Sequence, residues 1–150
     1  MSLFSALSVS ASGMSAQRTR AELLVENLAN AETTRTPEGG PYRRKDAVFE
    51  SNTVASPFAS VLFQQSEGSL DETSANGVRV AQIVTDTRDP ERRYLPGHPD
   101  ADAEGYVAFP RMNPAEDMVD LMSASRGYEA NVAAIGAVKD MIQRSIDLLR

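Results

Sequence analysis

Residues 114–150 read PAEDMVDLMSASRGYEANVAAIGAVKDMIQRSIDLLR, and this segment predicts one long helix. Its only proline is Pro114, at a first helical position that tolerates proline, and Asn113 is a suitable N-terminal cap. Glu116 and Asp117 place negative charge at the positive end of the helix dipole. Alternating steps of three and four residues connect Met118, Leu121, Ser125, Tyr128, Val132, Ile135, Lys139, Ile142, Ile146 and Leu149, eight of which are apolar.

The first 36 residues contain no proline and predict a second long helix. The same stepping connects Phe4, Leu7, Ala11, Met14, Arg18, Ala21, Val25 and Leu28, of which only Arg18 is not apolar. Ser, Ala and Gly13 surround this seam, so another backbone can approach closely, but they weaken the intrinsic helicity. Asn30 suits the end of the helix, because residues 33–41 contain two prolines and two glycines.

The middle of the chain is predicted to be β-rich and irregular. All eight prolines lie between Pro37 and Pro114, which disfavours long helices there. Asn76-Gly77 predicts a turn followed by a strand at 78–85, and 42–49, 60–64 and 105–109 are further strand candidates, with a long irregular stretch at 86–104. The predicted organisation is an N-terminal assembly helix at 1–32, a middle module at 33–113 with a β-hairpin-like part and a long loop, and a C-terminal assembly helix at 114–150.

Two arrangements of the helices are open on these patterns. They form a hairpin folded on the middle module in a monomer or simple dimer, or they are adhesive elements of a polymer. Neither helix is expected to be stable alone, because each seam buries too little apolar surface to offset the entropy of ordering. Both helices therefore need partners from the same chain or from neighbours.

Composition excludes several classes of protein. The net charge of −6 disfavours nucleic acid and anionic lipid as main partners, since both need clustered Lys and Arg. With no cysteine there are no disulfides, thiolate metal sites or cysteine nucleophiles. No apolar run approaches a membrane span, and the first residues lack the basic and compact apolar regions of a secretory signal peptide.

Candidate chemistry is confined to two short stretches. His98, with Asp100 and Asp102, could serve as a base or metal ligand, but no second His or serine elbow accompanies it. A loop histidine bonded to the backbone is the favoured interpretation, and the chain is predicted not to be an enzyme and to need no metal or cofactor. The basic run 43–45 is interpreted as an exposed strand face, with a docking patch for an acidic partner as the alternative.

Several segments together resemble the bacterial flagellar basal-body rod proteins, most closely those of the proximal rod. They are Gly13–Arg20, Asn27-Leu-Ala-Asn30 continuing to Lys45, the loop Tyr94–Asp102 with Gly105–Val107, and Ser125–Asn131 with Lys139. The residues that carry the resemblance are Asn27, Asn30, Gly40, Pro41, Tyr42, Arg43, Arg44, Gly97, His98, Pro99, Asp100, Asp102, Tyr128 and Asn131. They span nearly the whole chain in the right order.

The resemblance implies a structural subunit of a hollow rod that crosses the periplasm, transmits torque and passes exported subunits. It implies terminal helices that pair as an antiparallel coiled coil and assemble with other rod proteins and with further copies. The rod adaptor protein, the membrane-embedded ring and the flagellar type III export apparatus, which exports such chains without cleavage, are further implied partners. The alternatives are a soluble coiled-coil adaptor or export chaperone and, from another class, a metal-dependent enzyme using the His98 loop.

The predicted assembly interface follows from the two seams. Its members are the large side chains of both helices: Phe4, Leu7, Met14, Val25, Leu28, Met118, Leu121, Tyr128, Val132, Ile135, Ile142, Ile146 and Leu149.

Overall fold

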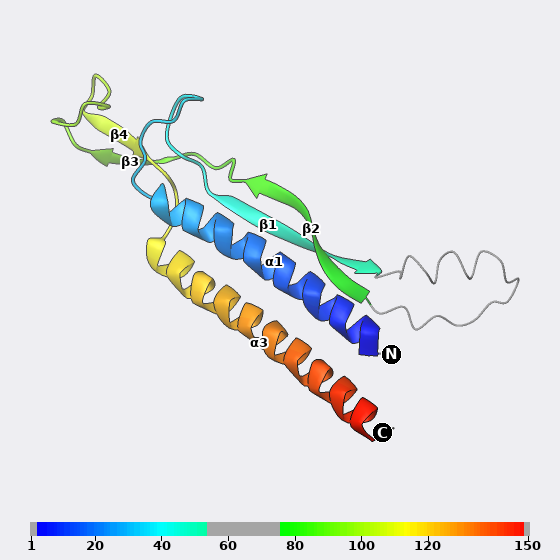
Figure 1. The fold of residues 1–150 in the computed structure, drawn as a ribbon. Coiled ribbons are helices and arrows are strands. Elements are labelled where there is room, and N and C mark those ends of the chain that lie inside the picture. The colour runs from blue at the N-terminus through cyan, green and yellow to red at the C-terminus, as the bar shows by residue number, and fades with distance from the viewer. Residues whose placement is uncertain (1–2, 54–75, 149–150) are drawn as a thin grey trace, which may run out of the picture. The chain divides into compact units, whose positions relative to one another are not determined.

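The computed structural model describes residues 3–53 and 76–148. Two long helices enclose four strands in chain order (Figure 1): α1 Leu3–Ala29, β1 Lys45–Thr53, β2 Asn76–Thr85, β3 Glu91–Tyr94, β4 Tyr106–Phe109 and α3 Pro114–Asp147. The predicted pattern of helix, β-rich middle and helix is therefore confirmed. The strand predicted at 60–64 and the seam residue Leu149 lie outside the described residues.

The ends of both helices are set by asparagine side chains. Asn113 Oδ1 accepts a hydrogen bond from the backbone N–H of Ala115 at 3.1 Å, which confirms the predicted cap of α3. At the end of α1, Asn30 donates from its side chain to the Glu26 carbonyl at 2.9 Å, and its own N–H also reaches that carbonyl. The Glu26 carbonyl therefore accepts two hydrogen bonds from Asn30 in the last turn of α1.

Strands β1 and β2 form a two-stranded sheet, and their arrows point in opposite directions in Figure 1. The first strand begins at Lys45, later than predicted, and runs on to Thr53. The predicted Asn76-Gly77 turn is wrong, because both residues already belong to β2. Gly77 is buried in the strand, and the following Val78 N–H donates to Ser12 Oγ of α1 at 3.1 Å. Gly77 is therefore a strand residue and not part of a turn.

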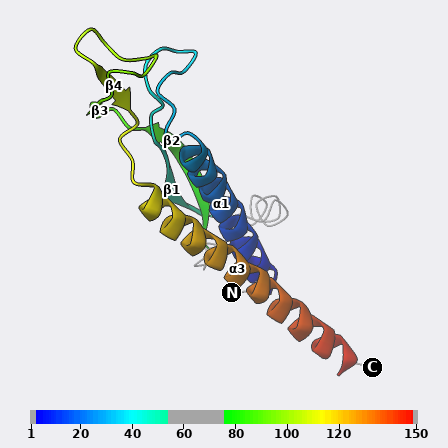
Figure 2. The same cartoon turned by 90° about the vertical axis from the view of Figure 1, so that its left-hand side faces the viewer.

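Strand β3 was not predicted, since 86–104 was expected to be irregular. Glu91–Tyr94 pairs antiparallel with β4, with Glu91 opposite Phe109 and Tyr94 opposite Tyr106 (Figures 1 and 2). The sequence ERRY has no apolar alternation, so no strand pattern was visible. Cross-strand contacts stabilise it instead: the Tyr94 and Tyr106 ring centroids are 5.3 Å apart, and Arg93 lies 4.9 Å from the Phe109 ring centroid.

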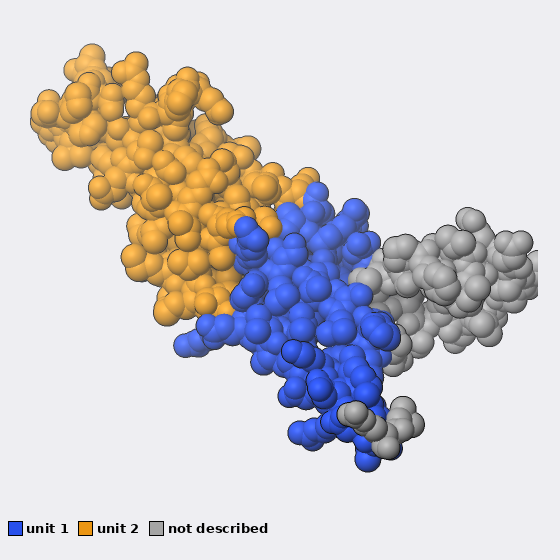
Figure 3. Space-filling view, viewed as in Figure 1, with its two compact units in different colours: residues 1–18, 49–81, 126–150 blue, residues 19–48, 82–125 orange. Residues whose placement is uncertain are grey.

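The chain divides into two compact units (Figure 3). Unit 1 comprises 1–18, 49–81 and 126–150, and unit 2 comprises 19–48 and 82–125. Among the described residues, the buried apolar side chains of unit 1 are Ala16 and Val138, and those of unit 2 are Leu23, Leu24, Tyr42, Val107, Phe109 and Ala124. Neither unit therefore has a large aromatic core, which agrees with an aromatic content of 6%.

Within unit 1, α1 and α3 meet through two glycines. A Cβ built on Gly13 would lie 2.9 Å from Asn131 Oδ1, and one built on Gly127 would lie 3.2 Å from Gln17 Cδ. Each helix thus presents a glycine to an amide side chain of the other. Because the higher-numbered α1 residue meets the lower-numbered α3 residue, the helices run antiparallel here. Asn131 is fixed by donating to the Gly127 carbonyl at 2.8 Å.

Candidate functional site

Asn27 is the best satisfied buried polar side chain of unit 2. It is fully buried in α1, and its amide bonds both backbone groups of Lys45 at the start of β1. The Nδ2 group donates to the Lys45 carbonyl at 2.8 Å, and Oδ1 accepts from the Lys45 N–H at 2.9 Å. Tyr42 OH also donates to Asn27 Oδ1 at 3.0 Å. These bonds attach the chain entering β1 to the helix.

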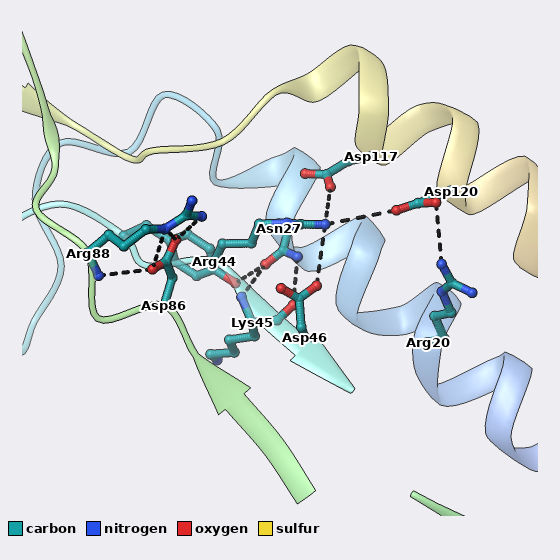
Figure 4. Close-up of polar contacts among 10 residues, drawn as sticks. Arg20, Asn27, Arg44, Lys45, Asp46, Asp86, Arg88, Asp117 and Asp120 are labelled. Atoms are coloured by element: carbon teal, nitrogen blue, oxygen red, sulfur yellow. Dashed lines mark hydrogen bonds and ion pairs between the residues drawn. The ribbon is translucent and has the colours of Figure 1, made fainter. Parts of the chain in front are cut away.

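Arg44 connects the same region to α3, as Figure 4 shows. Its Nη2 lies 2.9 Å from Asp117 Oδ1, 3.3 Å from Asp46 Oδ1 and 3.9 Å from Asp120 Oδ2. The Asp117 side chain is only 1% exposed, whereas that of Arg44 is 24% exposed. Arg44 is thus the cation that accompanies a buried carboxylate. We call Asn27, Tyr42, Arg44, Lys45 and Asp117 together the polar clamp.

Burial shifts two ionisable groups of the polar clamp. Desolvation raises the pKa of Asp117, and the opposing charge of Arg44 offsets only part of this effect. Desolvation, followed by the nearby charge of Glu26, raises the pKa of Tyr42 to about 12. Asp117 Oδ2 and Arg44 Nε are buried without a partner among the described residues. At the α3 end of the polar clamp, Arg44 therefore compensates only part of the cost of burying the charged Asp117 carboxylate.

Two ion pairs surround the polar clamp. Arg20 of α1 reaches Asp120 of α3 at 3.3 Å, and Lys45 Nζ reaches Glu26 Oε1 at 2.6 Å. All four side chains are at least a third exposed, so each pair contributes well under about 1 kcal/mol. Their role is orientation more than stability.

The polar side chains of the loop 94–106 bond to the loop backbone and to Thr34. His98 Nδ1 accepts from the Asp100 N–H at 3.1 Å, which confirms the prediction of a histidine bonded to the backbone. Asp100 Oδ2 accepts from Thr34 Oγ1 at 2.8 Å, and Asp102 Oδ1 accepts from the N–H groups of Glu104 and Tyr106. In residues 3–53 and 76–148, no cluster of three His, Asp or Glu side chains is placed to hold a metal ion.

The remaining residues of the resemblance occupy different settings. Gly40 has a φ of +77°, and its carbonyl accepts from the Thr36 N–H at 2.8 Å, so a left-handed backbone closes this turn. Arg43 donates to the Asp86 carbonyl. Pro41 is half-buried, and both Gly97 and Pro99 are exposed. The basic run 43–45 was predicted as an exposed strand face, which is wrong for Arg44 because its guanidinium is engaged with Asp117.

The structure places the predicted assembly interface in two groups. Leu7, Met14, Leu28, Leu121, Ile135 and Ile142 are half-buried. The exposed members are Phe4, Val25, Met118, Tyr128, Val132 and Ile146, with exposed fractions from 41% to 75%. The residues that pack fully within each unit, such as Ala16, Leu24 and Ala124, lie beside the seam and not on it.

Sequence reasoning missed several residues of these sites. Asp117 was assigned to the helix dipole only, and its pairing with Arg44 has no local signal because the two residues lie far apart in the chain. Val119 and Met122 are exposed by 60% and 55%, and together with Met118 they form an apolar surface on the first turns of α3. A search for apolar residues at i, i+1 and i+4 beside the seam would have found this surface.

Replacing Asn27 with Ala should lower the free energy of unfolding by about 3 kcal/mol, because three hydrogen bonds are lost and the Lys45 N–H is left unsatisfied. Urea unfolding followed by circular dichroism measures this loss. The matched control is Asn30→Ala at the half-buried helix end, where we expect about 1 kcal/mol. Equal losses in the two variants would show that Asn27 has no special place in the fold.

The chain was compared with known proteins. Residues 103–148 match the family model described as flagellar basal body rod FlgEFG protein C-terminal. Flagellar basal-body rod protein FlgC of Bacillus subtilis is 43% identical over 152 residues, covering 99% of both chains. The protein of that name from Borreliella burgdorferi is 41% identical over 154 residues, covering 100% of this chain and 99% of its own. That of Salmonella typhimurium is 34% identical over 148 residues, covering 99% and 98%.

Proposed function

As the chain belongs to the FlgC family of flagellar basal-body rod proteins, we propose that its two terminal helices are the elements through which it polymerises. The chain is a structural subunit of the basal-body rod, and the rod is where it resides. None of the described helices is long and apolar enough to cross a membrane. Other rod components are its partners.

The observation that carries the proposal is the exposed apolar surface on both helices. Phe4 and Val25 of α1 are exposed by 75% and 51%, and Met118 and Val132 of α3 by 51% and 47%. Side chains of this size gain about 2 kcal/mol each when they are removed from water. A protein that leaves them in regular array on its helices has a further surface to cover them. Neighbouring subunits provide that surface.

The finer features of the assembly follow from this role. The helices pair as an antiparallel coiled coil, consistent with the meeting of Gly13 with Asn131 and of Gln17 with Gly127 in unit 1. Residues 1–32 and 114–150 act as assembly segments and 33–113 as the middle module. The role is structural and not enzymatic, and the assembled rod transmits torque and passes exported subunits. The rod adaptor protein, the membrane-embedded ring and the export apparatus that delivers the chain without cleavage are the further partners.

Hydrogen exchange of the purified chain tests the assembly role. We expect faster amide exchange over the helical residues 3–18 and 126–148 of unit 1 in the monomer than around the polar clamp, because Ala16 and Val138 are the only buried apolar side chains among the described residues of unit 1. Strong protection of the same segments is expected once the chain is assembled with other rod proteins. Slow exchange throughout the lone monomer, unchanged on assembly, would contradict the proposal. A soluble adaptor or export chaperone would give that second pattern as a folded dimer.

A further inference from the structure

A hollow in unit 2 is lined by a set of arginines around one carboxylate. Arg43, Arg88 and Arg111, which we call the arginine cluster, surround Asp86, and Pro41 and Pro90 form part of the same wall. The three arginines are exposed. The hollow adjoins the polar clamp, because Tyr42 and Arg44 of the clamp also line it.

Asp86 forms an ion pair with Arg88. Arg88 Nη2 lies 2.6 Å from Asp86 Oδ2, Nε lies 2.9 and 3.0 Å from the two carboxylate oxygens, and the Arg88 N–H donates to Oδ1 at 2.9 Å. The hydrogen bonds from Arg88 lower the pKa of Asp86 to about 2, and the charge of Arg111 adds to this. The ion pair between Asp86 and Arg88 therefore persists over the whole physiological range of pH.

Arg43 and Arg111 are left without a carboxylate partner. Arg43 Nη1 donates to the Asp86 carbonyl at 3.1 Å, and the rest of its guanidinium has no bond among the described residues. Arg111 acts on Asp86 through its charge alone. No Asp or Glu of the described chain lies within ion-pair distance of either guanidinium. Arg43 and Arg111 are thus two exposed cations at one hollow that form no ion pair among the described residues, on a chain with a net charge of −6.

We propose that the arginine cluster docks carboxylate side chains of a second copy of this chain in the rod. The inference rests on the proposed function, since it assumes that copies of the subunit become neighbours. Guanidinium groups bind carboxylates bidentately, and the exposed donors of Arg43 and Arg111 are free to do so. The chain supplies the complement, with 21 acidic against 15 basic residues. The net negative charge disfavours nucleic acid and anionic lipid as occupants.

The probe is a labelled synthetic peptide, QSEGSLDETS, with the sequence of residues 65–74. That stretch carries Glu67, Asp71 and Glu72, and residues 54–75 contain no Lys or Arg. The host is the full-length chain with Glu67→Gln, Asp71→Asn and Glu72→Gln, so that it cannot compete with its own carboxylates. Fluorescence anisotropy of the unassembled protein measures the affinity, which keeps this test independent of rod assembly.

We expect the peptide to bind with an affinity that falls about tenfold between roughly 20 and 300 mM salt. The double substitution Arg43→Gln and Arg111→Gln should weaken binding about fivefold or more. Arg92→Gln, at an exposed arginine of β3 outside the hollow, should leave it unchanged. Circular dichroism establishes that each variant keeps its fold.

Equal binding by the double variant and the unchanged host would overturn the proposal. So would equal binding of the uncharged peptide QSQGSLNQTS, or binding of inorganic phosphate without binding of the acidic peptide. The two inferences can fail separately. If the double variant still assembles with helix protection but the peptide does not bind, only the docking role is lost. If the peptide binds but no helix protection develops on assembly, only the assembly role is lost.

Discussion

Replacing Val132 with Asp is expected to abolish incorporation of the chain into the rod while leaving the isolated chain folded. The Val132 side chain is 47% exposed on α3, so an aspartate there remains hydrated in the monomer and should change the free energy of unfolding by less than about 1 kcal/mol. In an assembled seam the same carboxylate loses its water without gaining a cation, at a cost of several kcal/mol. Every copy of the variant chain that enters the rod would bear this cost.

The measurement is complementation of cells that lack the native gene. Swimming in soft agar and the presence of the chain in isolated basal bodies should both be lost with Val132→Asp. The matched control is Ala133→Asp, since Ala133 is also exposed but lies about 100° away around the helix, off the predicted seam. Normal swimming with Val132→Asp would remove Val132 from the assembly interface. The predicted member Ile135 is half-buried, so an aspartate there would confound folding with assembly.

The second large effect concerns Arg44. Arg44→Met keeps much of the side-chain volume but leaves the carboxylate of Asp117, which is 1% exposed, without its cation. We expect a loss of about 3 kcal/mol in the free energy of unfolding near neutral pH. Arg92→Met is the control, because this exposed arginine makes no ion pair among the described residues. A loss at Arg44 as small as at Arg92 would show that Asp117 does not depend on its cation.

The Arg44→Met effect should also depend on pH in a defined direction. Burial raises the pKa of Asp117 in the folded state, and removal of Arg44 raises it further. A carboxyl with a raised folded pKa favours the fold when protonated, and this contribution disappears as the pH rises through the folded pKa. The penalty should therefore be smallest in acid and largest at neutral pH. Urea unfolding at about pH 4 and about pH 7.5 measures the difference. A penalty that grows in acid would contradict this account of Asp117.

The helices could be predicted because their signals are local. The absence of proline, the cap at Asn113 and the stop at Asn30 each act within a turn or two of the residues they control. Strand β3 could not be predicted, because Glu91–Tyr94 becomes a strand only through pairing with β4. The Asn76-Gly77 dipeptide was misleading for a related reason: both residues belong to β2, which pairs with β1, and not to a turn.

The residues of the candidate site also divide into those that the sequence could indicate and those that depend on contacts between distant segments. The residues Asn27, Tyr42 and Arg44 were picked out by resemblance, but their joint role in one clamp depends on contacts between α1, β1 and α3 that no spacing reveals. Asp117 looked like an ordinary first-turn acid. The assembly interface is the opposite case: its seam periodicity is readable in the sequence, and the partners that we propose for it are neighbouring subunits.

The paired glycines of unit 1 bear on how the two helices resist sliding past one another. Gly13 and Gln17 are one helical turn apart on α1, as are Gly127 and Asn131 on α3. Sliding the helices by one turn in one direction would set Gln17 against Asn131, two amides in the space of one. Sliding them the other way would set glycine against glycine and open a void. Axial shear between the two helices is therefore opposed in both directions, by a steric clash in one and by the loss of packing contacts in the other.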